Sequence, residues 1–236
     1  MGRQWLQKVR EENAAKKGKV STKLVREITV AAKSGTPDPA QNSRLALAVE
    51  AARKASVSSA TIDRAIKKGT GLLDEKDHSE LVTFEGFAPH RVPVIVECMT
   101  ENRNRTVPEM RVLFRDGQWG AKVGFLFHHV GLIEATHPQA GQDLEGAAIE
   151  AGAQEVEALE GVAAGQTGGR FISDRGDVDV VTKALQKAGW QVTAAELGYV
   201  AKEYPDVTPE QRAEVVKFLT ALDDHDDVHR VYAALR

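Results

Sequence analysis

The alternation of strand-like and helix-like segments between Gly131 and Leu197 constrains the fold of this chain more than any other feature. A helix with Asp143 as its N-cap ends at Gly152, and a second helix covers about Val178–Ala188. Strands are expected around them, at Leu132–Ala135, Glu155–Leu159, Arg170–Ile172 and Gln191–Glu196. The resulting order, βαββαβ, is that of a ferredoxin-like unit.

The last thirty or so residues predict a helix and a strand that have no partners of their own. Thr208–Gln211 reads as a capping box with Pro209 at the first helical position, and this helix runs to about Leu222. An acidic turn, Asp223–Asp227, leads to a strand at Val228–Tyr232. A lone helix and strand cannot bury their own apolar faces, so they must complete another part of the chain.

The region Leu81–Phe127 is the natural host for this helix and strand. It contains a β-rich segment at Val92–Met99, a helix that we expect to begin with a capping box at Thr106 and Glu109, and a strand at Val123–Phe127. One helix and one strand more are needed to complete a domain here, and the C-terminal pair would supply them.

Residues 1–71 predict only helices and carry most of the positive charge. Asn42 is a good N-cap for one helix, and Ser58 or Ser59 for the next. The segment holds 15 Lys and Arg against 6 Asp and Glu, a net charge of +9, whereas the remainder holds 16 against 28, a net charge of −12. A basic module on an acidic body is typical of nucleic-acid-binding proteins, although two unrelated fused modules could also show it.

The stretch Lys16–Lys33 forms a helix with two distinct sides. Val20, Leu24, Ile28, Ala31 and Ala32 fall on one side, and four cations fall nearly opposite within an arc of roughly 80°. Such a helix buries one side in a bundle. Its cationic side is either a solvated surface or a contact for an anionic partner.

Further cations are candidates for the same contact. The helix that Ser58 or Ser59 begins ends in cations, which also suit its dipole. Two arginines just ahead of the helix expected at Thr106 could hold a phosphate or could simply be solvated. The candidate nucleic-acid-binding residues are Lys16, Lys17, Lys19, Lys23, Arg26, Lys33, Arg64, Lys67, Lys68, Arg103 and Arg105.

Several sequence blocks together resemble the YebC family, which includes mitochondrial translational activators of cytochrome c oxidase. The blocks span nearly the whole chain: Lys23–Ala32, Arg64–Gly71, Phe84–Phe87, Val94–Cys98, Asn102–Thr106 and Asp226–Tyr232. The resemblance implies an α+β multidomain protein with a helical bundle, a middle α+β domain and a ferredoxin-like domain inserted into the middle one. The boundaries expected here are residues 1–75, residues 80–129 plus 205–236, and residues 130–204.

The chain departs from the common family pattern at three places. It begins Met1-Gly2-Arg3-Gln4-Trp5, like a divergent branch of the family. The turn Ala88–Arg91 stands where a glycine-rich turn is expected, and the loop Asp116–Gly120 is a shortened form of another glycine-rich loop. Contacts made by these segments in the family cannot be transferred to this chain.

The resemblance implies nucleic-acid-associated regulation without catalysis. Two roles are attached to the family, a ribosome-associated translation factor and a DNA-binding transcriptional regulator. The cations suit phosphate contacts, and no helix-turn-helix with polar base-reading residues is recognisable. Trp5 is the one aromatic residue in residues 1–71, so stacking on single strands is not indicated there. We therefore expect structured rRNA or tRNA as the partner, with duplex DNA as the alternative.

An enzyme is the third hypothesis. The chain has no P-loop, no dinucleotide-binding glycine fingerprint, no HExxH and no GxSxG motif, and we expect no catalytic residue, cofactor or metal. His225 and His229 lie among carboxylates and could bind a metal if they shared a helix, but the resemblance places them in a turn and a strand. The acidic turn Asp223–Asp227 could instead contact a basic protein.

The compartment expected is the cytoplasm. Cys98 is the single cysteine, so no internal disulfide can form, and we expect a buried, inert thiol. The sequence shows no signal peptide and no apolar segment long enough to span a membrane.

Overall fold

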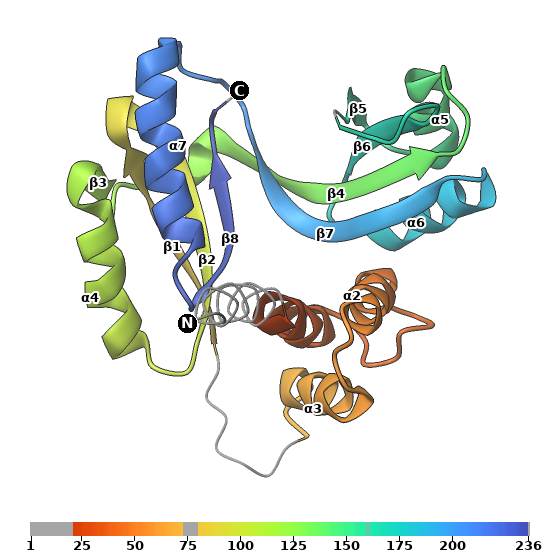
Figure 1. Cartoon of the computed structure of the whole chain (residues 1–236), viewed down its shortest axis with the longest axis horizontal. Helices are drawn as coiled ribbons and strands as arrows, with labels where there is room; N and C mark the ends of the chain where they lie inside the picture. The colour runs from red at the N-terminus through yellow and green to blue at the C-terminus, as the bar shows by residue number, and fades with distance from the viewer. Residues whose placement is uncertain (1–20, 73–79, 160, 236) are drawn as a thin grey trace, which may run out of the picture. The chain divides into compact units, whose positions relative to one another are not determined.

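The computed structural model describes residues 21–72, 80–159 and 161–235 of the chain (Figure 1). Chain contacts divide it into two compact units, Met1–Asp77 and His78–Arg236. Among the described residues, no helix is long and apolar enough to cross a membrane.

The first unit is built from helices that pack through small apolar side chains. A helix covers residues 21–34, followed by α2 (Ser43–Lys54) and α3 (Ser59–Gly69). Many of the core side chains are alanines, which let the helix backbones approach closely. The buried core consists of Ile28, Ala31, Ala32, Leu45, Ala48, Val49, Ala52, Ile62 and Ala65, with Leu24 packed against it.

Two polar contacts fix the first helix to α2. Asn42 caps α2 by accepting from the backbone N–H of Leu45 at 3.0 Å, and its buried amide donates to the carbonyl of Ala31 at 3.0 Å. Arg44 donates to Glu27 at 2.7 Å, and both side chains are nearly buried. The predicted N-caps at Asn42 and Ser58 are therefore confirmed.

The second unit contains two antiparallel sheets, of which the first joins distant parts of the chain. Its strand order is β3-β1-β2-β8. The C-terminal strand pairs with β2, and α7 covers the sheet beside α4 (Figure 1). The C-terminal helix and strand thus complete the region near Leu81–Phe127, as expected. The bounds are β1 Glu80–Ala88, β2 Val92–Thr100, β3 Gln118–Trp119, β8 Val228–Ala233, α4 Arg103–Leu113 and α7 Pro209–Asp223.

The second sheet is formed by consecutive elements of the chain. They follow in the order β4-α5-β5-β6-α6-β7, and the strands lie in the order β5-β6-β4-β7 with every neighbouring pair antiparallel. The Asp143 cap and the left-handed Gly152 are confirmed. The bounds are β4 Phe127–His137, α5 Leu144–Ala151, β5 Glu155–Ala158, β6 Thr167–Ser173, α6 Val178–Lys187 and β7 Gln191–Ala201.

A small apolar core joins the two sheets of the second unit. Ile95 on β2 and Ala234 after β8 pack with Val123, Phe127 and Ala201. Phe127 is the first residue of β4 and Ala201 the last of β7. The side chains of Phe87, Leu126, Tyr199, Tyr204 and Tyr232 pack against this joint core. Cys98 is buried, as expected.

Two local predictions in the second unit are wrong. Val123–Phe127 is not a strand, because the carboxylate of Glu85 accepts hydrogen bonds from the backbones of Val123 and Gly124 and turns the chain into a 3₁₀ segment, η3 (Gly124–Leu126). The helix expected at Thr106 begins a turn earlier, with Asn102 as its N-cap. Thr106 is instead a buried residue inside the helix.

Candidate nucleic-acid interface

Three cations of the first unit, Lys33, Lys67 and Lys68, lie on two helix ends that pack together. Gly69, the last residue of α3, packs so closely on the helix of residues 21–34 that a Cβ there would lie 2.8 Å from the Cβ of Ala32 and 3.2 Å from the backbone nitrogen of Lys33. Lys67 and Lys68 precede this glycine directly. The fold of the unit therefore brings the backbone of Lys33 close to the end of α3 that carries Lys67 and Lys68.

The candidates differ in how far they reach into solvent. Lys33, Arg64 and Lys67 are exposed, whereas Lys23, Arg26 and Lys68 are half-buried. All of these except Lys67 have interaction partners within the protein. Lys16, Lys17 and Lys19 lie outside the described residues.

Arg103 and Arg105 lie in the first turn of α4 rather than ahead of it. Arg103 is exposed. The guanidinium of Arg105 donates to both oxygens of the Asp227 carboxylate at 2.9 and 2.7 Å, and it lies 3.8 Å from Glu109. The hydrogen bond and the charge of Asp227 raise the pKa of Arg105. Arg105 is thus committed to an ion pair within the protein, whereas the side chain of Arg103 is open to solvent.

One carboxylate of the acidic turn Asp223–Asp227 is buried and three are exposed. Asp227 is buried and also accepts from the hydroxyl of Thr106 at 2.6 Å. Burial raises the pKa of its carboxyl and is the largest single influence on it. The hydrogen bonds from Thr106 and Arg105 and the charge of Arg105 outweigh burial together, so the pKa lies below its ordinary value. Asp223, Asp224 and Asp226 are exposed.

His225, Glu109 and Asp227 form the one group in the described part of the chain with metal-ligand chemistry and spacing, their ligand atoms all lying within 4.8 Å of one another. The ligand atoms already have partners. His225 bonds Glu109 at 3.2 Å through Nε2 and accepts from the backbone of Asp227 at 3.1 Å through Nδ1. The guanidinium of Arg105 occupies the Asp227 carboxylate, and a metal would have to displace this cation. The donor set therefore fits an ion-pair network better than a metal site.

The structure also separates the two histidines of the metal hypothesis. His225 follows α7, and His229 lies within β8, where it is 1% exposed. His229 does not belong to the group of possible ligands found among the described residues.

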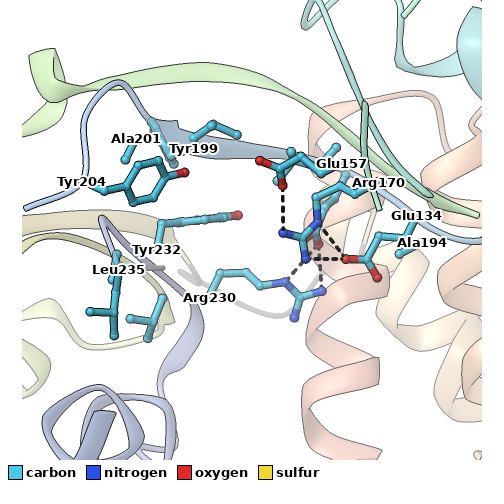
Figure 2. Close-up of a pocket in the computed structure, with 15 residues that line it drawn as sticks. Glu134, Glu157, Arg170, Ala194, Tyr199, Ala201, Tyr204, Arg230, Tyr232 and Leu235 are labelled. Carbon is cyan, nitrogen blue, oxygen red and sulfur yellow. Dashed lines mark hydrogen bonds and ion pairs between the residues drawn. The ribbon is translucent and has the colours of Figure 1, made fainter. Parts of the chain in front are cut away.

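A cleft of about 420 Å³ lies between the second sheet and β8 (Figure 2). Its charged lining is internally paired. Arg170 bonds Glu134 at 2.8 Å and approaches Glu157 at 3.9 Å, and Arg230 bonds Glu196 at 2.8 Å. Three carboxylates against two guanidinium groups leave the lining with an excess of negative charge, which gives no support for phosphate binding there.

Three tyrosines form the other side of this cleft (Figure 2). The rings of Tyr199 and Tyr232 lie 5.2 Å apart, and the hydroxyl of Tyr232 donates to the carbonyl of Leu197 at 3.3 Å. A Cβ at Gly198 would lie 3.0 Å from the ring of Tyr232, so this glycine permits the close contact between β7 and β8. Arg230 and Tyr232, both on β8, thus hold the two sheets together through Glu196, Leu197 and Tyr199 of β7.

Sequence reasoning missed the residues of this cleft. Glu134 and Arg170 face each other across β4 and β6, and this pair could have been found by aligning the two predicted strands. Arg230 and Glu196 come from strands that meet only because the chain returns to the first sheet, and no local signal announces that contact.

Comparison with known proteins identifies relatives over the whole length of the chain. The family model described as "TACO1/YebC protein N-terminal domain" matches residues 3–72, and that described as "TACO1/YebC second and third domain" matches residues 79–235.

Proteins named "probable transcriptional regulatory protein" are among the relatives. One from Pseudomonas savastanoi is 52% identical over 100% of this chain and 99% of its own length. One from Bdellovibrio bacteriovorus is 48% identical over the full length of both chains. The crystal structure of a conserved hypothetical protein from Aquifex aeolicus superposes with a TM-score of 0.81 at 36% identity, covering 94% of this chain and 91% of that one.

Proposed function

Because the chain belongs to the TACO1/YebC family, we propose that it is a non-enzymatic regulator of gene expression that binds structured RNA through the phosphate backbone. In this proposal the partner is rRNA or tRNA on the ribosome, and the protein acts as a translation factor in the cytoplasm.

The observation that carries the proposal is the close packing of two helix ends, one carrying Lys33 and the other carrying Lys67 and Lys68. These cations belong to the segment with a net charge of +9, and two helix ends hold them close together. A cluster of cations on rigid helices suits phosphates at a fixed spacing. Lys23, Arg26 and Arg64 extend the proposed surface along the same helices. Lys19, which lies outside the described residues, and Arg103, on the second unit, are further candidate contacts.

Phosphate contact without base reading favours recognition by shape. The lysines and arginines of this surface supply positive charge for phosphates. Base readout requires side chains such as asparagine, glutamine or arginine that point into a groove and reach the base edges. A structured RNA offers a distinctive arrangement of phosphates that such a surface can recognise. The names of the bacterial relatives favour a second candidate, a transcriptional regulator that binds duplex DNA.

We also propose that residues 130–204 form a ferredoxin-like domain inserted into the middle α+β domain. The strand order β5-β6-β4-β7 with antiparallel neighbours supports this assignment, as does the connection of β4 and β7 to the joint core. The helical bundle of residues 1–75 would carry the main phosphate contacts.

Binding of RNA to the full chain should weaken steeply as the salt concentration rises. If roughly five phosphates are neutralised, the slope of log K against log salt should be about −4, because each neutralised phosphate releases its counterions. Fluorescence anisotropy with a labelled, folded tRNA at several salt concentrations measures the slope. A slope near zero would point to a protein partner and contradict phosphate binding.

A further inference from the structure

One large aromatic side chain of the second unit is exposed on a short, well-anchored turn. Phe125, in η3 between β3 and β4, is 70% exposed. Its neighbours Val123 and Phe127 are both buried in the joint core. The chain therefore turns one aromatic side chain outward between two apolar side chains that it buries.

Hydrogen bonds hold the backbone of this turn from both sides. One carboxylate oxygen of Glu85, on β1, accepts from Val123 N at 2.7 Å and from Gly124 N at 2.6 Å. On the other side, the carbonyl of Leu126 accepts from the backbone of Lys202 at 2.9 Å. Because the backbone is fixed at Val123, Gly124 and Leu126, on both sides of Phe125, the outward position of Phe125 is a property of the fold and not of a loose loop.

Two exposed cations come from the chain segments that meet at this turn, and a third comes from the turn between β1 and β2. Lys122 precedes the turn. The backbone N–H of Lys202 donates to the carbonyl of Leu126, the last residue of the turn. Arg91 lies with its guanidinium 5.3 Å from the ring centre of Phe87, which packs against the same joint core as Val123 and Leu126. Within the described ranges, none of the three cations makes an ion pair.

The backbone conformation at Arg91 is unusual and sets the position of this cation. His90 and Arg91 both have positive φ, 61° and 59°, which is uncommon for residues other than glycine. The bond of His90 to Glu214 on α7 at 2.7 Å helps to hold this conformation. The turn between β1 and β2 thus fixes Arg91 over Phe87.

We propose that Phe125 stacks on an unpaired base of RNA while Lys122, Lys202 and Arg91 contact the flanking phosphates. This proposal rests on the proposed function and adds to it a site on the second unit that distinguishes unpaired from paired RNA. Proteins that bind single-stranded nucleic acids commonly use an exposed aromatic ring, on which a base stacks, together with cations that contact the backbone. Bases within a duplex stack on each other and cannot offer a face to the ring.

Exposure alone does not define this site, as a second apolar residue shows. Ile149 on α5 is 79% exposed, but its neighbours in the sequence and one turn away are Glu150 and Glu145. That surface would repel phosphates, and it provides a matched control.

The test compares the affinities of full-length variants for a single-stranded RNA and for a duplex of the same sequence, by anisotropy at low salt. Phe125→Ala should weaken single-strand binding by roughly 5- to 100-fold, because one stacking contact is lost. Duplex binding should not change. Phe125→Trp should retain single-strand binding, whereas Phe125→Leu should not, because leucine keeps the apolar volume without an aromatic face.

Ile149→Ala should bind both RNAs like the unmodified chain, and thermal unfolding should show that every variant is folded. If Phe125→Ala binds the single strand as tightly as Ile149→Ala does, or if the unmodified chain binds only the duplex, the stacking site is wrong and the phosphate-binding function stands. If the unmodified chain binds neither RNA, both proposals fail.

Discussion

Replacing Asp227 with alanine is expected to lower the free energy of unfolding by about 3 kcal/mol, the low end for removing one partner of a buried ion pair. The carboxylate accepts two hydrogen bonds from Arg105 and one from Thr106, and its side chain is only 9% exposed. The contacts join the start of α4 to the start of β8. The loss should stay at the low end because the guanidinium of Arg105 is half-exposed and can be hydrated in the variant.

Asp226→Ala is the matched control, because Asp226 is the exposed neighbour of Asp227. Urea unfolding of both variants and the unmodified chain measures the difference. Equal stabilities for Asp227→Ala and Asp226→Ala would show that the network around Arg105 contributes nothing.

The pH dependence of this difference provides a second check. The folded-state pKa of Asp227 lies below its ordinary value, so its contribution is complete above the unfolded pKa of about 4 and is lost as the pH falls through the folded value. The gap between the unmodified chain and Asp227→Ala should therefore be constant near neutral pH and shrink below about pH 4. A gap that widened in acid would contradict the lowered pKa.

Reversing Lys19, Lys23 and Arg26 to glutamate should abolish RNA binding, with a loss of at least about 100-fold at low salt. Each reversal removes a phosphate contact and places a negative charge in its position. The control reverses the exposed Lys183, Lys187 and Lys217 of α6 and α7, which changes the net charge equally in the second unit. Anisotropy with folded tRNA compares the two triple variants.

Half-burial of Lys23 and Arg26 makes a fold-safe companion variant necessary. Lys33→Glu with Lys67→Glu changes two exposed positions at the meeting helix ends and should also weaken binding strongly, with circular dichroism unchanged. Equal binding by this double variant, the control variant and the unmodified chain would place the RNA contact elsewhere.

Local signals predicted the helix starts well, except where a distant contact decided the boundary. The caps at Asn42, Ser58, Asp143 and Thr208 are confirmed, because a capping side chain and the N–H groups it satisfies lie within one turn. At α4, the sequence predicted Thr106 as the cap. In the structure Asn102 is the cap. The hydroxyl of Thr106 is buried and donates to the carboxylate of Asp227, 121 residues further along the chain.

The same limitation applies to the candidate site. A helical wheel could assign Lys33 to the cationic side of its helix, but the packing of Gly69 against Ala32 that brings Lys67 and Lys68 near it required the fold. Sequence reasoning could not see that Arg105 has a buried partner in Asp227. It could not find the exposed ring of Phe125 either, because the double hydrogen bond to Glu85 turns an apparent strand into η3.

Crosslinking in living cells, followed by sequencing of the attached nucleic acid, tests the central claim most directly. Cells would produce either the unmodified chain or the variant with Lys19, Lys23 and Arg26 reversed to glutamate. The account predicts that ribosomal or transfer RNA is enriched with the unmodified chain and lost with the variant. Enrichment of promoter DNA alone, or equal recovery of RNA with both chains, would contradict it.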